Sequence, residues 1–356
     1  MFSVSFSTDG TCIVSGSKEA FVRVWEASTG AELKVLEGHT GPVWSVAWST
    51  DGTGIISGSD DTSVQVWDAL TGAELTVLEG HTDTVWSVAF CTDGTHIVSG
   101  SSDKSVRVWD VLTGAKLKVL EGHSKAVLSV PFSTDGTRIV SGSQDESIWV
   151  WDALTGADLK VLEGHTDTVW SVSFSIDNTR IVSGSDDKSL RVWDALTGAE
   201  LIVLEGHTAG IYSAAFSTDG TRIVSGSSDK SVRVWDVSTR AELKVLEGHT
   251  YYVQSVSFST DGTRIVSGSK DNSVRVWDVS CEAQAKVPNI HTDSPNTITS
   301  PADNICITSD DESARLSIVG PAYPAWTTDP NSGFVLYFVG IGSCGCQWWF
   351  IHTASL

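Results

Sequence analysis

Histidine, serine and aspartate recur through this 356-residue chain, and these are the residue types that nucleophilic hydrolases combine in a catalytic triad. Six of the nine histidines stand 42 residues apart, each directly after a glycine, in the pairs Gly38-His39, Gly80-His81, Gly122-His123, Gly164-His165, Gly206-His207 and Gly248-His249. A nucleophile site is a single constellation in a cleft beside an oxyanion hole, whereas a set that is repeated in every unit is typical of a folding element. The repetition therefore predicts a structural role, and we expect the protein not to be an enzyme.

Seven tryptophans, each followed by an acidic residue, keep the same step of 42 residues. They are Trp25-Glu26, Trp67-Asp68, Trp109-Asp110, Trp151-Asp152, Trp193-Asp194, Trp235-Asp236 and Trp277-Asp278. A fixed period of about 20 to 50 residues indicates an array of like supersecondary units, each of which buries its apolar faces against the next.

One unit of this array reads as four short strands, predicted in the second unit over residues 43–48, 55–59, 64–67 and 74–78. Asp51-Gly52 supplies the positive φ of a hairpin turn, and Thr71-Gly72 marks the turn before the last strand. Apolar residues on both sides of the strands suit a sheet between two like sheets, and radial repetition of such sheets gives a β-propeller. The predicted fold is an all-β propeller of seven four-stranded antiparallel blades.

Two local departures from the repeat agree with this fold. Asn178 replaces glycine after Asp177, in a turn that requires a left-handed residue. Pro131 lies in a first strand, where proline is tolerated only at an edge such as the one that faces the channel. We therefore expect the first strand of each unit to be the innermost one.

The Gly-His and Trp-Asp pairs at these offsets resemble those of the WD40-repeat β-propeller family, over residues 1 to about 293. In that family a histidine, a strand serine, an aspartate before the third strand and the tryptophan form a hydrogen-bonded tetrad. The resemblance implies six tetrads here: His39, Ser57, Asp61 and Trp67; His81, Ser99, Asp103 and Trp109; His123, Ser141, Asp145 and Trp151; His165, Ser183, Asp187 and Trp193; His207, Ser225, Asp229 and Trp235; His249, Ser267, Asp271 and Trp277.

The two ends of the repeat array meet at a seam. Met1 aligns with Val43, and residues 1–294 make seven periods of 42, so each end contributes a complete blade. His291 falls 42 residues after His249 and is predicted to complete a first tetrad with Ser15, Glu19 and Trp25. With no strand exchanged across the seam, we expect packing alone to hold it closed.

Residues 295–356 leave the period. Part of this segment is similar in sequence to an earlier unit and is interpreted as a degenerate eighth repeat. We expect it either to pack on the seam or to form an irregular eighth blade. The apolar remainder is too short to span a bilayer and is interpreted as capping strands. A tail from a misjudged reading frame is the competing interpretation.

The charge balance restricts partners and compartment. The chain has 44 acidic and 23 basic residues, a formal charge of −21, which repels nucleic acid and anionic membranes. The cysteines follow no disulfide pattern, and no secretory leader is visible, so a cytoplasmic location is expected. Cys344 and Cys346 lack a second ligand pair, and there is no phosphate-binding loop motif, so neither a metal nor another cofactor is predicted.

A binding surface is predicted from the few positions that vary between units. In WD40 proteins these positions lie on the top face around the mouth of the channel. Aromatic residues there anchor interfaces, and the candidates are Trp44, Trp86, Trp170, Tyr212, Tyr251 and Tyr252, with Gln144 and Lys270 from the position before the tetrad aspartate. The alternative interpretation is that these rings only pack blade against blade.

The main functional hypothesis is a noncatalytic scaffold that binds a protein or peptide through the top face. The near-identical repeats also resemble the sensor arrays of NACHT-type receptors, so the alternative is the ligand-sensing C-terminal fragment of a NACHT-type signalling NTPase. The sequence leaves the partner and the oligomeric state open.

Overall fold

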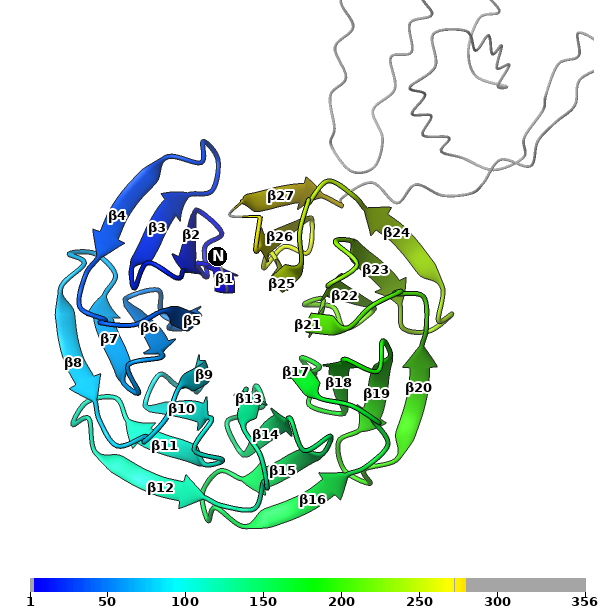
Figure 1. Ribbon diagram of the computed structural model, residues 1–356, viewed down its shortest axis with the longest axis horizontal. Coiled ribbons are helices and arrows are strands. Elements are labelled where there is room, and N and C mark those ends of the chain that lie inside the picture. The colour runs from blue at the N-terminus through cyan, green and yellow to red at the C-terminus, as the bar shows by residue number, and fades with distance from the viewer. Residues whose placement is uncertain (1–2, 272, 280–356) are drawn as a thin grey trace, which may run out of the picture. The chain divides into compact units, whose positions relative to one another are not determined.

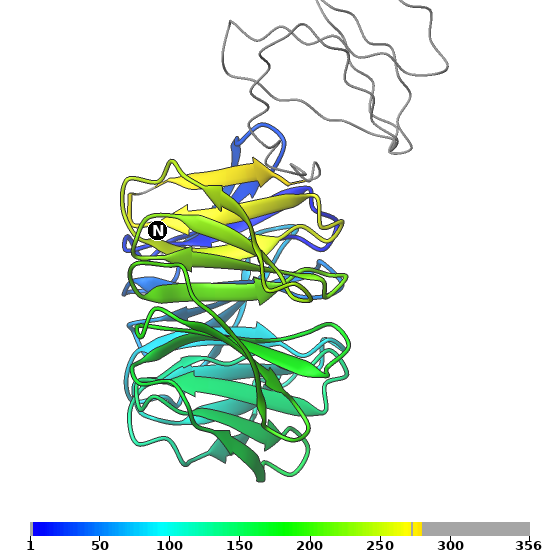
Figure 2. The ribbon, with the colours of Figure 1, turned by 90° about the vertical axis from the view of Figure 1, so that its right-hand side faces the viewer.

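The computed structural model describes residues 3–271 and 273–279, and it shows seven antiparallel sheets arranged radially around a central axis (Figure 1). The strands of each sheet follow chain order, with the first strand nearest the axis and the last at the rim. The strands run between the two faces of the ring (Figure 2). The predicted seven-bladed propeller is confirmed.

Blades one to four each contain four strands. The first blade contains β1 (Ser3–Phe6), β2 (Cys12–Gly16), β3 (Val22–Glu26) and β4 (Glu32–Leu36). The second contains β5 (Val43–Trp48), β6 (Gly54–Ser59), β7 (Val64–Asp68) and β8 (Glu74–Leu78). The third contains β9 (Val85–Phe90), β10 (His96–Ser101), β11 (Val106–Asp110) and β12 (Lys116–Leu120). The fourth contains β13 (Val127–Ser129), β14 (Arg138–Ser143), β15 (Ile148–Asp152) and β16 (Asp158–Leu162).

The remaining three blades complete the ring. The fifth contains β17 (Val169–Phe174), β18 (Arg180–Ser185), β19 (Leu190–Asp194) and β20 (Glu200–Leu204). The sixth contains β21 (Ile211–Phe216), β22 (Arg222–Ser227), β23 (Val232–Asp236) and β24 (Glu242–Leu246). The described part of the seventh contains β25 (Val253–Phe258), β26 (Arg264–Ser269) and β27 (Val274–Asp278). The predicted boundary at residue 294 and the predicted eighth repeat lie outside the described residues.

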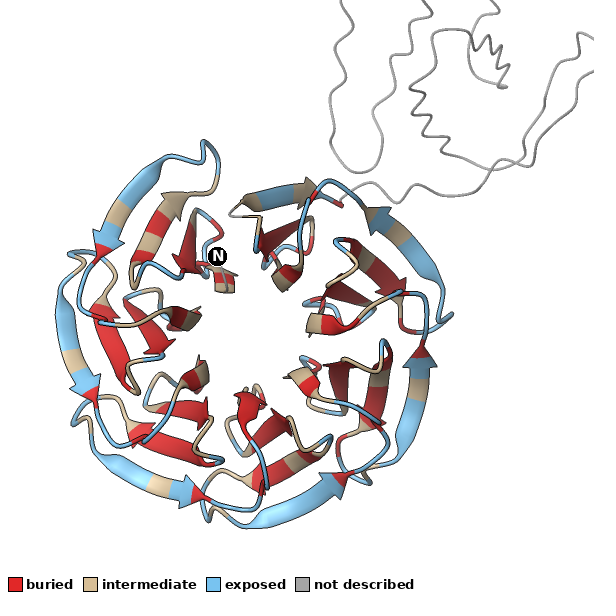
Figure 3. Ribbon diagram, viewed as in Figure 1, coloured by how far each residue is buried: buried red, intermediate tan, exposed pale blue. Residues whose placement is uncertain are grey.

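The apolar core is divided into seven clusters, each of which two neighbouring blades share. In one of them Val98 and Val106 of the third blade pack with Val127 and Ile139 of the fourth. The second and third strands are mostly buried and the outer strands mostly exposed (Figure 3). Burial of each such side chain contributes about 1.5–3 kcal/mol. A blade therefore obtains its core from its neighbours.

The blades approach so closely that the second strand requires a glycine. A Cβ atom built on Gly100 of β10 would lie 2.9 Å from the Cγ1 atoms of both Val127 and Val130 in the next blade. Real Cβ atoms do not approach other carbons this closely, so a side chain at this position would push the two sheets apart. The repeated Ser-Gly-Ser sequence thus sets the spacing between blades.

A hydrogen bond of one kind joins every blade to the next. A serine of each inner strand accepts a bond from a backbone N–H of a neighbouring inner strand, at 3.0–3.2 Å. The donor and acceptor pairs are Val46 and Ser3, Val88 and Ser45, Val130 and Ser87, Val172 and Ser129, Ala214 and Ser171, Val256 and Ser213, and Val4 and Ser255. The last pair lies across the seam.

The expectation that packing alone holds the seam is therefore wrong. Val4 N donates to Ser255 Oγ at 3.1 Å, and Ser255 Oγ lies 3.2 Å from the Val4 carbonyl. The Arg264 guanidinium lies 5.6 Å from the centroid of the Phe6 ring, as Arg222 lies 5.4 Å from Phe258 inside the array. Because the units are near-copies, the first and last blades meet in the same register as any other pair.

We expect Ser255→Ala to lower the free energy of unfolding by about 1–3 kcal/mol, because it leaves the amide of Val4 without its partner. Ser213→Ala removes the equivalent bond to Val256 inside the array and is the matched control. Urea unfolding followed by tryptophan fluorescence measures both. Equal losses support a closed ring; a loss for Ser213→Ala with none for Ser255→Ala would show that the seam is open in solution.

One of the two local departures from the repeat lies as predicted, and the other shortens its strand. Asn178 has a φ of 58°, in the left-handed region that Gly52 occupies at 72° in the second blade. Pro131 stands on the inner edge of the fourth blade but two residues beyond β13, which keeps three residues against six in β9. The left-handed turn at Asn178 is confirmed, whereas the placement of Pro131 within a strand is wrong, because the proline has no N–H group to continue the pairing.

Arg240 is an irregularity that the sequence pattern did not single out. Its φ is 63°, whereas the equivalent turn position elsewhere is glycine, such as Gly198 with a φ of 78°. A non-glycine residue in this conformation costs about 1–2 kcal/mol, which the greater flexibility of unfolded glycine partly offsets. The side chain of Arg240 is exposed, so no burial compensates the strain.

Arg240→Gly is therefore expected to raise the free energy of unfolding by about 0.5–1 kcal/mol. The reverse change at an equivalent turn, Gly198→Arg, is the control and should lower it. Chemical denaturation at pH 7 measures both variants. A destabilised Arg240→Gly would show that the arginine makes a compensating contact.

Candidate functional site

Six tetrads of histidine, serine, aspartate and tryptophan are brought together inside the blades. In the second blade His39 Nδ1 lies 2.8 Å from Asp61 Oδ2 and His39 Nε2 lies 2.7 Å from Ser57 Oγ. Trp67 Nε1 donates to the same serine oxygen at 2.8 Å. Across the six blades the corresponding distances are 2.7–2.9, 2.7–2.8 and 2.7–2.9 Å.

The protons of a tetrad follow from its donors and acceptors. The Asp61 carboxylate only accepts, so His39 Nδ1–H donates to it and Nε2 is left as an acceptor. Ser57 Oγ–H then donates to Nε2 and accepts from the Trp67 indole. Ser57 has no exposed surface, so no substrate reaches this hydroxyl. The geometry is that of an internal tie between the turn, the second strand and the third.

The tetrad also perturbs the protonation of its members. Burial alone would raise the pKa of Asp61, but hydrogen bonds from His39, Ser63 and the Thr40 amide outweigh it and hold the pKa well below its usual range. In the third blade burial lowers the pKa of His81, against the opposing effect of the Asp103 carboxylate. The lowered pKa values of His81 and Asp103 favour a neutral imidazole beside an ionised carboxylate, and the hydrogen bonds fit this pairing.

The first blade has a partial set. Trp25 Nε1 donates to Ser15 Oγ at 2.8 Å, as in the other blades. His291, which is predicted to complete this set beside Glu19, lies outside the described residues. Trp25 is only half-buried, whereas Trp67 is 1% exposed.

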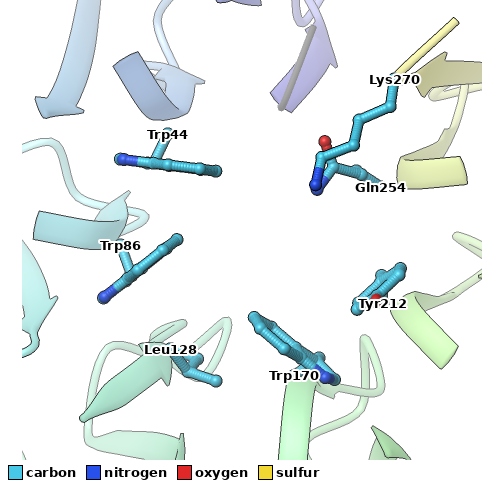
Figure 4. Close-up of a pocket in the computed structure, with 7 residues that line it drawn as sticks. All are labelled: Trp44, Trp86, Leu128, Trp170, Tyr212, Gln254 and Lys270. Atoms are coloured by element: carbon cyan, nitrogen blue, oxygen red, sulfur yellow. The ribbon is translucent and has the colours of Figure 1, made fainter. Parts of the chain in front are cut away.

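A small cavity at the centre of the ring is the second candidate site (Figure 4). Its volume is about 200 Å³, and seven residues line it: Trp44, Trp86, Leu128, Trp170, Tyr212, Gln254 and Lys270. The first six occupy one position in six successive inner strands, and Lys270 follows β26. We call it the mouth cavity. It opens on the face that carries the turns between second and third strands, which we call the top face.

The indole nitrogens of two lining tryptophans are already bonded. Trp44 Nε1 donates to Asp60 Oδ1 at 2.9 Å, and Trp86 Nε1 donates to Ser102 Oγ at 2.7 Å. These nitrogens point away from the centre of the cavity, so the rings turn carbon atoms towards it (Figure 4). The variable position before the tetrad aspartate thus fixes the ring that lines the cavity.

The aromatic rings also contact one another. The centroids of Trp44 and Trp86 are 4.4 Å apart, and those of Trp170 and Tyr212 are 5.0 Å apart in an edge-to-face arrangement. The alternative interpretation, ring packing between blades, therefore describes part of their role. The same rings line the cavity, and the two roles coexist.

The predicted binding residues divide into two groups. Trp44, Trp86, Trp170, Tyr212 and Lys270 line the mouth cavity. Three do not: the Tyr252 ring packs on Tyr212 at 6.1 Å, the half-exposed Tyr251 ring lies 4.3 Å from Tyr252, and Gln144 bonds to the Ala126 carbonyl through its backbone.

Two lining residues, Leu128 and Gln254, were not among the predicted ones. They stand at the same repeat position as the lining aromatic residues, and this shared register was the signal available in the sequence. Among residues 3–271 and 273–279 no group of three histidine, cysteine, aspartate or glutamate side chains is placed to hold a metal ion. The same residues include no helix long and apolar enough to cross a membrane.

We expect unfolding to be favoured in two steps as the pH falls. The pKa of His81 and that of Asp103 are both lowered in the folded chain, so the unfolded chain binds these protons more readily. Stability is then full above about pH 6.5 and declines below it, with a further decline below about pH 4. Urea unfolding at pH 7, 5 and 3 tests this sign.

The controls use two histidines. His81→Gln should cost about 1–3 kcal/mol at pH 7 and reduce the decline between pH 7 and 5, because a buried hydrogen-bonded group is lost. His96 lies outside the tetrads and bonds to Thr95. His96→Gln should therefore change neither the free energy of unfolding at pH 7 nor its decline between pH 7 and 5. Stability that rises as the pH falls to 5 would contradict the assignment of a neutral imidazole.

A comparison with protein-family models matches the description "WD domain, G-beta repeat" to seven successive segments. These are residues 1–26, 30–68, 72–110, 114–152, 156–194, 198–236 and 240–278, which together make up well over half of the chain. A comparison with curated proteins gave no match.

Proposed function

The chain belongs to the WD40-repeat family, and from this premise we propose that it is a noncatalytic scaffold that binds a protein or peptide through its top face. Propellers of this family commonly mediate protein–protein interaction. The proposal includes a cytoplasmic location, in keeping with the unpatterned cysteines.

The observation that supports the proposal most is the mouth cavity. Most positions scarcely differ between units, yet the position that lines the cavity holds tryptophan, leucine, tyrosine or glutamine. If these residues served only the packing of the propeller, one side chain repeated in each blade would be sufficient, as it is in the tetrads. Variation at the positions that line a concave aromatic site suits the recognition of one asymmetric partner.

The composition of the site suits a peptide. Tryptophan and tyrosine supply large contact areas with few rotatable bonds, and they dominate the energetics of interfaces. Tyr251 is 46% exposed beside the cavity and extends the aromatic surface outward through Tyr252. A cavity of about 200 Å³ admits one side chain, so the remainder of a partner would lie across the surrounding loops.

Peptide-phage selection against the immobilised full chain tests the proposal. Trp86→Ala, Trp170→Ala and Tyr212→Ala should each weaken binding of the selected peptides about tenfold or more, while the melting temperature falls by only a few degrees from lost contacts between rings. Leu112 and Leu154, which are 93% and 82% exposed in turns of the opposite face, provide the control variants Leu112→Ala and Leu154→Ala.

The outcomes separate binding from packing. Lost binding in the three cavity variants, with the control variants unaffected, supports the scaffold. Melting temperatures that fall in parallel with binding would show that the rings serve the core instead. Selection of no peptide that depends on the cavity residues would contradict the proposed face.

A further inference from the structure

We propose that the mouth cavity recognises a peptide residue that joins an apolar body to a carboxylate, with the carboxylate at Lys270. This inference rests on the proposed function and specifies the chemistry of its partner. It follows from an uneven distribution of charge around the cavity.

The charge asymmetry lies at the position before each tetrad aspartate. From the first blade to the seventh this position holds Lys18, Asp60, Ser102, Gln144, Asp186, Ser228 and Lys270. Both lysines belong to the blades that meet at the seam, where β1 packs on β25 and β26. The chain has a formal charge of −21, and the two cations among these seven positions lie on adjacent blades.

Lys270 is the cation that lines the cavity. Its Nζ atom lies 5.9 Å from the centroid of the Tyr252 ring, a cation–π contact that positions the ammonium group without neutralising it. No carboxylate lies within 4.0 Å of this ammonium among the residues that the structure describes. An oriented cation without a counter-charge attracts an anionic group.

Gln254 lies beside Lys270 on the same side of the cavity (Figure 4). Its Oε1 atom is buried and bonds to none of the described residues. The amide NH₂ group likewise bonds to none of the described residues and is not buried, so it can donate to a carboxylate in the cavity. Two donors would then meet one carboxylate.

The opposite side of the cavity is apolar. Trp86 and Leu128 lie across from Lys270 and Gln254 (Figure 4). Because Asp60 and Ser102 already accept the indole N–H groups of Trp44 and Trp86, these rings offer carbon surface to a ligand. A ligand with one apolar and one anionic end fits this polarity in a single orientation.

Two acidic residues precede tetrad aspartates beside the lining aromatic residues. Asp60 accepts bonds from Trp44 and from the Thr84 hydroxyl, at 2.9 and 2.8 Å. Burial, with the nearby carboxylates of Asp167 and Asp187, raises the pKa of Asp186 against the effect of Trp170. These acids disfavour an anion on their side and so reinforce its placement at Lys270.

Three probes that share a phenylalkyl group and differ in their terminal group test the inference: 3-phenylpropionate, 3-phenylpropanamide and 3-phenylpropylammonium. Their dissociation constants for the full chain are measured by ligand-observed NMR titration. We expect the carboxylate to bind at least about fivefold more tightly than the amide, and the ammonium to bind most weakly. Raising the salt concentration should reduce the preference for the carboxylate.

Variants assign that preference to one residue. Lys270→Met keeps the length of the side chain but removes its charge, and should make the carboxylate and the amide bind equally. Lys18→Met, on the neighbouring blade, is the matched control and should change the preference less than twofold. Tyr212→Ala should weaken all three probes together, since it removes part of the shared apolar wall.

The results distinguish the inference from the proposed function. A preference for the ammonium, or a preference for the carboxylate that survives Lys270→Met, overturns the inference. Equal binding of the three probes that still depends on Tyr212 also overturns it, but leaves the cavity as a binding site. Binding of none of the probes counts against both, whereas phage peptides that depend on the cavity would still support the scaffold.

Discussion

The structure depends on one constraint: no blade encloses a core of its own. Every buried cluster combines the second and third strands of one sheet with the first and second strands of the next. A sheet of about twenty residues with two apolar faces is stable only between two other sheets. The array must therefore close, or it leaves one apolar face exposed to water at each end. The close approach at Gly100 and the serine bonds between inner strands show how tightly this condition is met.

The tetrads act within this frame, on the loops that leave the sheet. Each one ties the loop that enters a blade, through histidine, to the second strand and to the turn before the third. With these loops fixed by charge-assisted hydrogen bonds, the neighbouring variable residue has a defined position, as Asp60 has beside Asp61. The tetrad, which is the same in these blades, thereby positions the variable residue before its aspartate.

The sequence predicted the ring because its turns and period are local signals. The Asp51-Gly52 turn and the tryptophan step report on one unit, and repetition supplies the rest. It did not predict Ser255 as a link across the seam, since a serine in a strand gives no sign that its partner lies in another blade. Gln144 stands at the same repeat position as Lys270, yet of these two only Lys270 lines the cavity, a difference that the repeat register alone does not predict.

The hydrogen bond between Val4 and Ser255 makes the contact of the first and last inner strands equivalent to the other inner-strand contacts of the ring. These links alone do not mark where the chain starts. A chain opened in a different inter-blade loop could therefore still form each of these inner-strand hydrogen bonds. Whole blades can therefore be duplicated, exchanged or replaced, and the residues of the mouth cavity can vary, while these links between blades are kept.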